Sequence, residues 1–205
     1  DWDLSGAIEM YVVAAAKDVQ GAKFAVQFDA EALYVGGEVR DPSPLMNRHA
    51  PEAEGDMAWD ADACQFRLVL DPSQGYPVMD TTYKREANDQ LVHLLLWYYT
   101  DRKEPNLLVH RSMRYEPLPD SEKFGVLKKD KFQGAYRLMD DGRGYTFEYR
   151  IPWKTLEAKN PPKGGDVTAA TMQIDWGRAD GLKTAGYSGW GYDLMAWPGF
   201  AYQNA

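Results

Sequence analysis

The sequence predicts an all-β protein, an antiparallel β-sandwich or jelly roll, for three reasons. At least eight short segments are apolar or alternate apolar and polar residues, and Gly, Pro, Asp and Asn bound them. Sustained helical periodicity is scarce. The chain also has 7 tryptophans and 13 tyrosines among 205 residues, and aromatic side chains are favoured in strands. Many short strands without long helices are typical of two packed antiparallel sheets.

The expected strands follow one another at short intervals. They are Ala22–Phe28, Ala32–Val39, Ala63–Leu70, Leu91–Tyr99, Leu107–Tyr115, Phe132–Leu138, Tyr145–Ile151 and Val167–Trp176. Turns are predicted at Asp29–Ala32 and at Asp140–Gly144, where the residue types favour hairpin connections. The helical candidates are Ile8–Ala16 and a single turn at Trp153–Leu156, where Pro152 suits a first-turn position.

Two long connections, Arg40–Asp62 and Pro72–Gln90, exceed what a compact sandwich needs, and binding sites tend to lie on such loops. The first contains a cluster of acidic residues: Glu52, Glu54, Asp56, Asp60 and Asp62. Calcium prefers oxygen ligands of this kind, although the spacing is not that of an EF-hand. The cluster predicts either a structural calcium ion, with ligands unassigned, or solvated loop acids.

Length and composition limit the class of protein. We expect residues 1–205 to form one domain, cut from a longer polypeptide. The formal net charge of −8 disfavours nucleic acid and anionic membrane as partners. No membrane-spanning stretch is present, and the opening Asp1-Trp2-Asp3 is unlike a leader peptide, so an exported chain would have lost its signal.

Enzymatic chemistry has little support in the sequence. The Gly-x-Ser-x-Gly elbow of serine hydrolases is absent. Cys64 lies in an apolar run without a nearby histidine, which indicates a core residue. The three histidines, His49, His93 and His110, lack the spacing of a metal site, and no carboxylate pair stands out for glycoside cleavage. We therefore expect a chain without catalytic activity.

Two tryptophans stand out as candidate binding residues. Trp59 ends a long polar loop just before a strand, and Trp190 lies in a glycine-flanked stretch near the end of the chain. Brought together, they could sandwich the flat face of a sugar ring; alternatively, each plugs one end of the sandwich. Trp97, Tyr98 and Tyr99 alternate along a strand, so one face of that run is free, and Trp97 is a further candidate.

Several segments together resemble the family 9 carbohydrate-binding modules and the wider DOMON-like group of β-sandwiches. The matching segments are Asp29–Val35 with Val39–Pro42, Trp59–Leu68 ending in Asp71, Tyr149–Leu156, and Met172–Asp175; Asp1–Ser5 resembles the family's opening motif. They occur in the family's order and cover most of the chain.

The resemblance implies non-covalent carbohydrate binding by a two-tryptophan clamp. Trp59 stands at the position of the first tryptophan, and Trp190, or else Trp197, is the candidate for the second. Gln65 stands where family members have a glutamate that bonds sugar hydroxyls. Such a module would be secreted, periplasmic or at the cell surface, and would hold an attached or associated polysaccharide-active enzyme near its substrate.

Two other functions stay open at this point. The wider DOMON-like group includes haem-binding domains, but no pair of axial ligands is marked in this sequence. We therefore expect no haem. The third alternative is a structural sandwich domain without a ligand.

Overall fold

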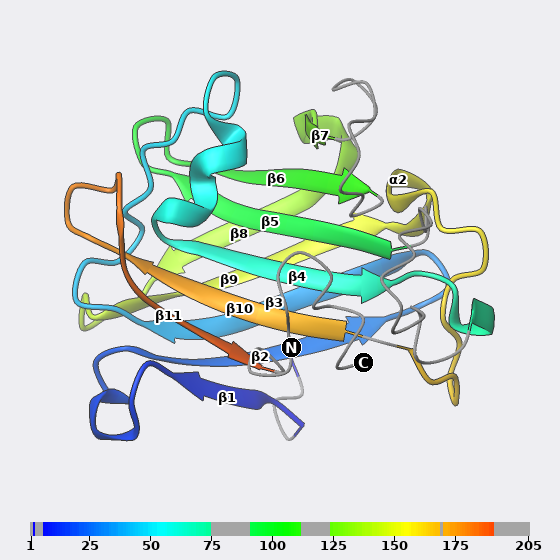
Figure 1. Ribbon diagram of the computed structural model, residues 1–205, viewed down its shortest axis with the longest axis horizontal. Helices are drawn as coiled ribbons and strands as arrows, with labels where there is room; N and C mark the ends of the chain where they lie inside the picture. The colour runs from blue at the N-terminus through cyan, green and yellow to red at the C-terminus, as the bar shows by residue number, and fades with distance from the viewer. Residues whose placement is uncertain (1, 3–5, 75–90, 112–123, 169, 191–205) are drawn as a thin grey trace, which may run out of the picture.

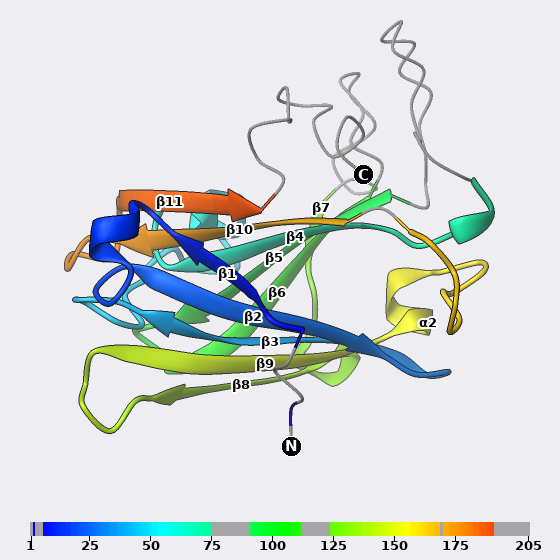
Figure 2. The same cartoon turned by 90° about the horizontal axis from the view of Figure 1, so that it is seen from below.

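The computed structural model describes residues 2, 6–74, 91–111, 124–168 and 170–190. Two antiparallel sheets face each other across a shared hydrophobic core (Figures 1 and 2). Sheet A has the strand order β1-β2-β3-β9-β8, and sheet B has the order β11-β10-β4-β5-β6-β7. The all-β sandwich expected from the sequence is confirmed.

The strands of sheet A are β1 (Ile8–Tyr11), β2 (Gly21–Phe28), β3 (Ala32–Arg40), β8 (Gln133–Leu138) and β9 (Gly144–Pro152). Those of sheet B are β4 (Ala63–Val69), β5 (Leu91–Tyr99), β6 (Glu104–Arg111), β7 (Phe124–Val126), β10 (Ala170–Gly177) and β11 (Thr184–Trp190). The helical segments are short: η1 (Ala14–Ala16), η2 (Gly55–Asp60), η3 (Pro72–Gln74), η4 (Lys129–Lys131) and α2 (Trp153–Leu156). Within the described ranges, no helix is long and apolar enough to cross a membrane.

The core lies between the two sheets and contains every second side chain of the central strands. In β9 these are Tyr145, Phe147, Tyr149 and Ile151, and in β4 they include Cys64 and Phe66. Burial raises the pKa of the Cys64 thiol, which keeps it protonated and unreactive. Cys64 is therefore the core residue that the sequence indicates.

All eight expected strands are present in the described residues, with ends that differ by a few positions. Residues 112–115 and 75–90, which belong to two expected segments, lie outside them. The Asp29–Ala32 turn is closed by the Asp29 carboxylate, whose Oδ1 accepts from the amides of Glu31 and Ala32. In the second turn, Gly142 adopts a φ of 68°, a conformation that glycine allows at low cost.

The expected helix at Ile8–Ala16 is wrong. Ile8–Tyr11 forms β1, which pairs with the edge of β2, and only Ala14–Ala16 turns as a 3₁₀ helix. The apolar spacing of this segment fits both periods, and the β-branched Val12 and Val13 disfavour a continuous helix. The single turn expected at Trp153–Leu156 is confirmed as α2, with Pro152 as the residue before its first turn.

Candidate functional site

The outer face of sheet B is the surface on which Trp59, Gln65 and Trp97 lie. All seven side chains of β4 are buried, so this strand is covered on both of its faces. Its core-facing residues alternate with polar ones, which meet the polar residues of β10 because Gln65 pairs with Gln173 and Arg67 with Thr171. Buried polar side chains are normally hydrogen-bonded, so contacts among the polar side chains of this face are expected.

A buried polar network results, made of Gln65, Arg67, Gln173 and Asp175. Gln65 donates through Nε2 to Asp175 Oδ2 at 2.7 Å, and Gln173 donates through Nε2 to Asp175 Oδ1 at 2.6 Å. Arg67 donates through Nη2 to Gln65 Oε1 at 3.1 Å. Both polar atoms of the Gln65 side chain thus already make hydrogen bonds inside the protein.

The burial of this network changes the acidity of its members. Desolvation raises the pKa of Asp175 to about 7, although the two amide donors and Arg67 oppose the rise. His93, next to Arg67 across β4 and β5, has its pKa held well below the usual range by burial and by that guanidinium. His93 and the neighbouring His110 lie side by side on one face, with 6.3 Å between ring centroids, so they do not face each other across a haem slot.

Trp97 belongs to a second, smaller hydrophobic cluster on this outer face. It is fully buried and packs with Ala58, Ala63, Leu95 and Leu108 beneath η2. Its indole Nε1 has no hydrogen-bond partner among the described residues. The side chain of Trp97 therefore supports η2 and is not itself exposed to a ligand.

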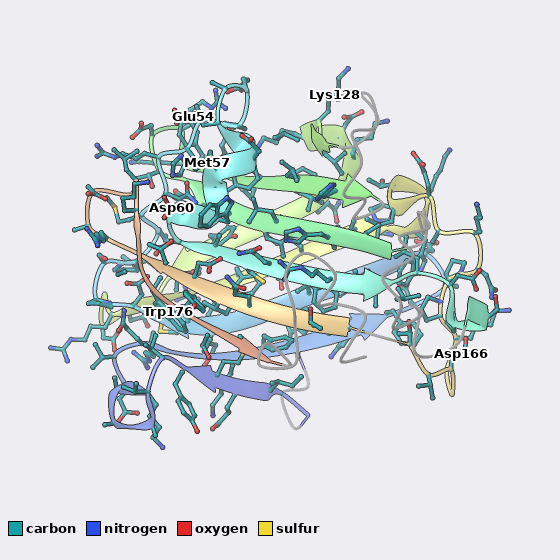
Figure 3. All side chains as sticks on the ribbon, viewed as in Figure 1. Glu54, Met57, Asp60, Lys128, Asp166 and Trp176 are labelled. Atoms are coloured by element: carbon teal, nitrogen blue, oxygen red, sulfur yellow. The ribbon has the colours of Figure 1, made fainter. Side chains whose placement is uncertain are left out.

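Trp59 lies on η2 with 43% of its surface exposed. The next residue, Asp60, anchors this end of η2 to β11: its carboxylate accepts from Lys183 Nζ at 2.6 Å and from the Thr184 amide at 3.0 Å. Figure 3 labels Met57 and Asp60 on η2 in front of sheet B. A tryptophan that plugs the sandwich would be buried, so the exposure of Trp59 argues against the plug alternative.

Trp190 is the last residue of β11, where its backbone pairs with Met172. The glycine-flanked stretch that contains Trp190 is therefore a strand. The side chain of Trp190 lies outside the described residues, as does all of Trp197. The Trp59 carbonyl is near Thr184 at the other end of β11. Six residues of strand correspond to about 20 Å, so the backbones near Trp59 and at Trp190 are separated by more than one sugar ring.

The acidic residues of the 52–62 loop do not converge on one point. Asp60 binds Lys183 and Thr184, Asp62 accepts from the amides of Met46 and Gly177, and Glu52 pairs with Arg102. In the described part of the chain, no three His, Cys, Asp or Glu side chains are placed to share a metal ion. The described residues of this loop thus form no calcium ligand set, and the calcium ion stays a prediction without assigned ligands.

The sequence analysis did not identify Arg67, Gln173 or Asp175. A signal was present: β4 and β10 each place polar residues at every second position of runs that otherwise match buried strands. Polar residues in that pattern normally indicate a solvated face. Their burial arises from tertiary contacts, which a single strand does not specify.

Comparisons with known proteins support the fold. No family model matches this chain, and no curated protein matches it. A crystal structure from Bacteroides uniformis ATCC 8492, of a protein for which carbohydrate binding has been suggested, aligns with a TM-score of 0.50. The alignment covers 90% of this chain and 75% of the other at 8% sequence identity, so the similarity concerns the architecture of the two proteins.

Proposed function

We propose that this chain binds carbohydrate non-covalently and has no catalytic role, with Trp59 as the principal contact. The observation that carries this proposal is the exposed indole of Trp59 on an otherwise anchored 3₁₀ helix. An aromatic ring covers the C–H face of a sugar well, and its value for binding increases when the protein holds it rigid. The resemblance to carbohydrate-binding modules and the fold of the Bacteroides protein point in the same direction.

The other candidate residues take different parts in this proposal. Gln65 and Trp97 do not contact the ligand in this proposal, because both are buried. Gln65 organises the polar network, and Trp97 packs against η2 and supports it. Trp190 is the proposed second aromatic contact. With its backbone near the far end of β11, it would meet a different unit of the same glycan chain.

The biological role in this proposal is targeting. A non-catalytic module of a secreted, periplasmic or cell-surface protein would keep an attached or associated polysaccharide-active enzyme near its substrate. This raises the effective concentration of the enzyme without changing its chemical barrier.

The test compares Trp59→Ala with the wild-type chain on a glycan array and in affinity gels that contain soluble polysaccharides. We expect at least a tenfold loss of affinity, with a change in the free energy of unfolding of about 1 kcal/mol or less because the ring is exposed. Met57→Ala is the matched control, since Met57 is an exposed apolar residue of the same helix. Its affinity should stay within about twofold of wild type.

Three results would contradict this proposal. Full binding by the Trp59→Ala variant would exclude Trp59 as the contact. A folded wild-type chain that binds no glycan would favour the structural alternative, and a Soret band in its visible spectrum would favour the haem alternative.

A further inference from the structure

The outer face of sheet A contains a groove of about 1110 Å³ that none of the predicted site residues lines. Its lining comes from strands β2, β3, β9 and β8, and covers positions 133–137 of β8 and 146–150 of β9. Its floor includes Glu148 and Ala135, which belong to a cross-strand row with three small members among four: Ala25, Gly36, Glu148 and Ala135. At this level β2, β3 and β8 contribute only small residues, and Glu148 of β9 is the one large side chain of the row.

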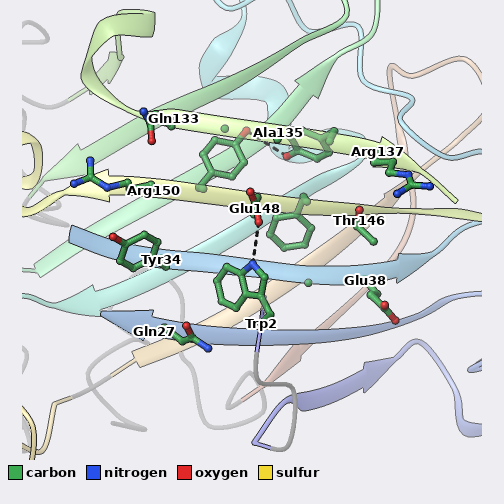
Figure 4. A pocket seen from close by; sticks show the side chains of 15 residues that line it. Trp2, Gln27, Tyr34, Glu38, Gln133, Ala135, Arg137, Thr146, Glu148 and Arg150 are labelled. Carbon is green, nitrogen blue, oxygen red and sulfur yellow. Dashed lines mark hydrogen bonds between the residues drawn. The ribbon is translucent and has the colours of Figure 1, made fainter. Parts of the chain in front are cut away.

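Trp2 lies on this floor. A Cβ atom added at Gly36 would be 2.6 Å from the Trp2 ring, so the indole rests directly on the backbone of β3. Its Nε1 donates to Glu148 Oε2 at 2.9 Å, as Figure 4 shows. The indole is half-buried and therefore fixed in place while part of it stays accessible.

A second aromatic ring borders the same groove. Tyr34 belongs to the adjacent row, which continues with polar side chains on both sides: Gln27, Arg150 and Gln133. The Tyr34 hydroxyl donates to Asp29 Oδ2 at 2.8 Å, so its polar end is held at the turn between β2 and β3. Figure 4 shows Tyr34 and Trp2 next to each other along β3.

The charges of the groove are balanced. Its charged side chains are Glu38, Glu148, Arg137 and Arg150. The two carboxylates and the two guanidinium groups of this lining cancel in formal charge. Amides, hydroxyls and two fixed aromatic rings suit a neutral ligand that has both C–H faces and hydroxyl groups.

We propose that this groove is a second, independent binding site that takes an internal stretch of a neutral polysaccharide chain. The contacts of Trp2 and Tyr34 carry the proposal, whether or not Trp59 binds sugar. The groove spans four strands from β2 to the edge strand β8, about 14 Å at the usual strand spacing, which is more than one sugar unit needs. Its floor ends at Ala135 on an exposed strand edge, so the chain can extend beyond the site.

The test measures affinity for neutral oligosaccharides of one to six units, prepared from β-glucan, xylan, mannan and α-glucan, by titration calorimetry. Each is also used with its reducing end converted to the alditol. We expect affinity to rise with the number of units and to survive this conversion.

Variants assign the binding to the groove. Tyr34→Ala, which removes one ring, and Ala135→Arg, which fills the floor without removing a contact, should each weaken binding at least tenfold. Tyr34→Phe keeps the ring and should retain most of the affinity. Tyr11→Ala is the matched control, because Tyr11 is an exposed tyrosine of the same sheet that does not line the groove.

The outcomes separate the two sites. Loss in the groove variants with retention in Trp59→Ala supports the groove. Loss in Trp59→Ala alone overturns the groove and leaves the proposed function standing. Affinity that does not depend on chain length, or that disappears with the alditol, overturns recognition of an internal stretch. Self-association that Tyr34→Ala abolishes, without glycan binding, would identify the groove as an interface between copies of the chain.

Discussion

On sheet A, the outward side chains of β9 stay accessible and only the alternate, core-facing ones are buried, whereas every side chain of β4 in sheet B is buried. Thr146, Glu148 and Arg150 therefore meet water, and Arg150 pairs with the exposed Glu31. On sheet B, Gln65 and Arg67 also point away from the core, but their side chains are buried.

The difference shows how the same strand pattern serves two purposes. A polar group in water loses little if its partner is removed, but a buried one must be hydrogen-bonded or it costs free energy. The outer face of sheet A can thus exchange its contacts for those of a ligand. The outer face of sheet B instead has buried polar side chains that bond one another, and Trp59 is exposed on η2 above them.

The largest effect is expected from Trp97→Ala. Because Trp97 is fully buried in the smaller hydrophobic cluster, its truncation should lower the free energy of unfolding by about 3–5 kcal/mol in urea titrations. Trp59→Ala serves as the comparison, since its exposed ring should cost far less. Equal losses in the two variants would show that the covered and exposed tryptophans do not differ as the structure indicates.

A smaller effect is expected from the titration of Asp175. Its pKa is about 7 in the folded chain and about 3.9 in an unfolded one, so between these values the native state holds a proton that the unfolded state has released. Raising the pH through this window should therefore lower the free energy of unfolding, by an amount on the order of a few kcal/mol. Urea titrations at several pH values measure it.

Asp175→Asn removes this titration and should flatten the pH dependence between about pH 4 and 7. Asp41 and Asp62 provide a background of the same sign, because burial raises the pKa of both carboxyls and the two are close neighbours. Comparison of the variant with wild type isolates the contribution of Asp175. An unchanged slope would mean that Asp175 is ionised throughout and that the network is more polar than its burial indicates.

The smallest effect on stability is expected from Gly36→Ala on sheet A. The φ of Gly36 does not require glycine, and the atoms nearest to the new Cβ would be those of the Trp2 ring, which the Cβ would displace from its place on β3. The free energy of unfolding should change by about 1 kcal/mol or less. The fluorescence of Trp2, taken as the difference from a Trp2→Phe background, should shift as its bond to Glu148 breaks. An unchanged spectrum would show that Trp2 does not rest on Gly36.

The strand pattern could be predicted because alternation is a local property of the chain. Ala32–Arg40 and Leu91–Tyr99 were identified nearly to their ends, since short runs rich in apolar and aromatic residues, bounded by turn residues, favour strands. The short edge strands β1 and β7 and the glycine-containing edge strand β11 were missed. Edge strands depend on a neighbour more than on their own sequence, and glycine weakens the signal.

By itself, the sequence determined the all-β class, most of the strands, both turns and the burial of Cys64, and it singled out Trp59 as a candidate binding residue. The tertiary structure decided which outward residues are covered and which are open. Trp2 meets Glu148 across 146 positions of sequence, and Gln65 meets Asp175 across 110. Alternation assigns a residue to a face of its own strand, but only the packing of distant segments fixes whether that face meets water, a groove or another layer of protein.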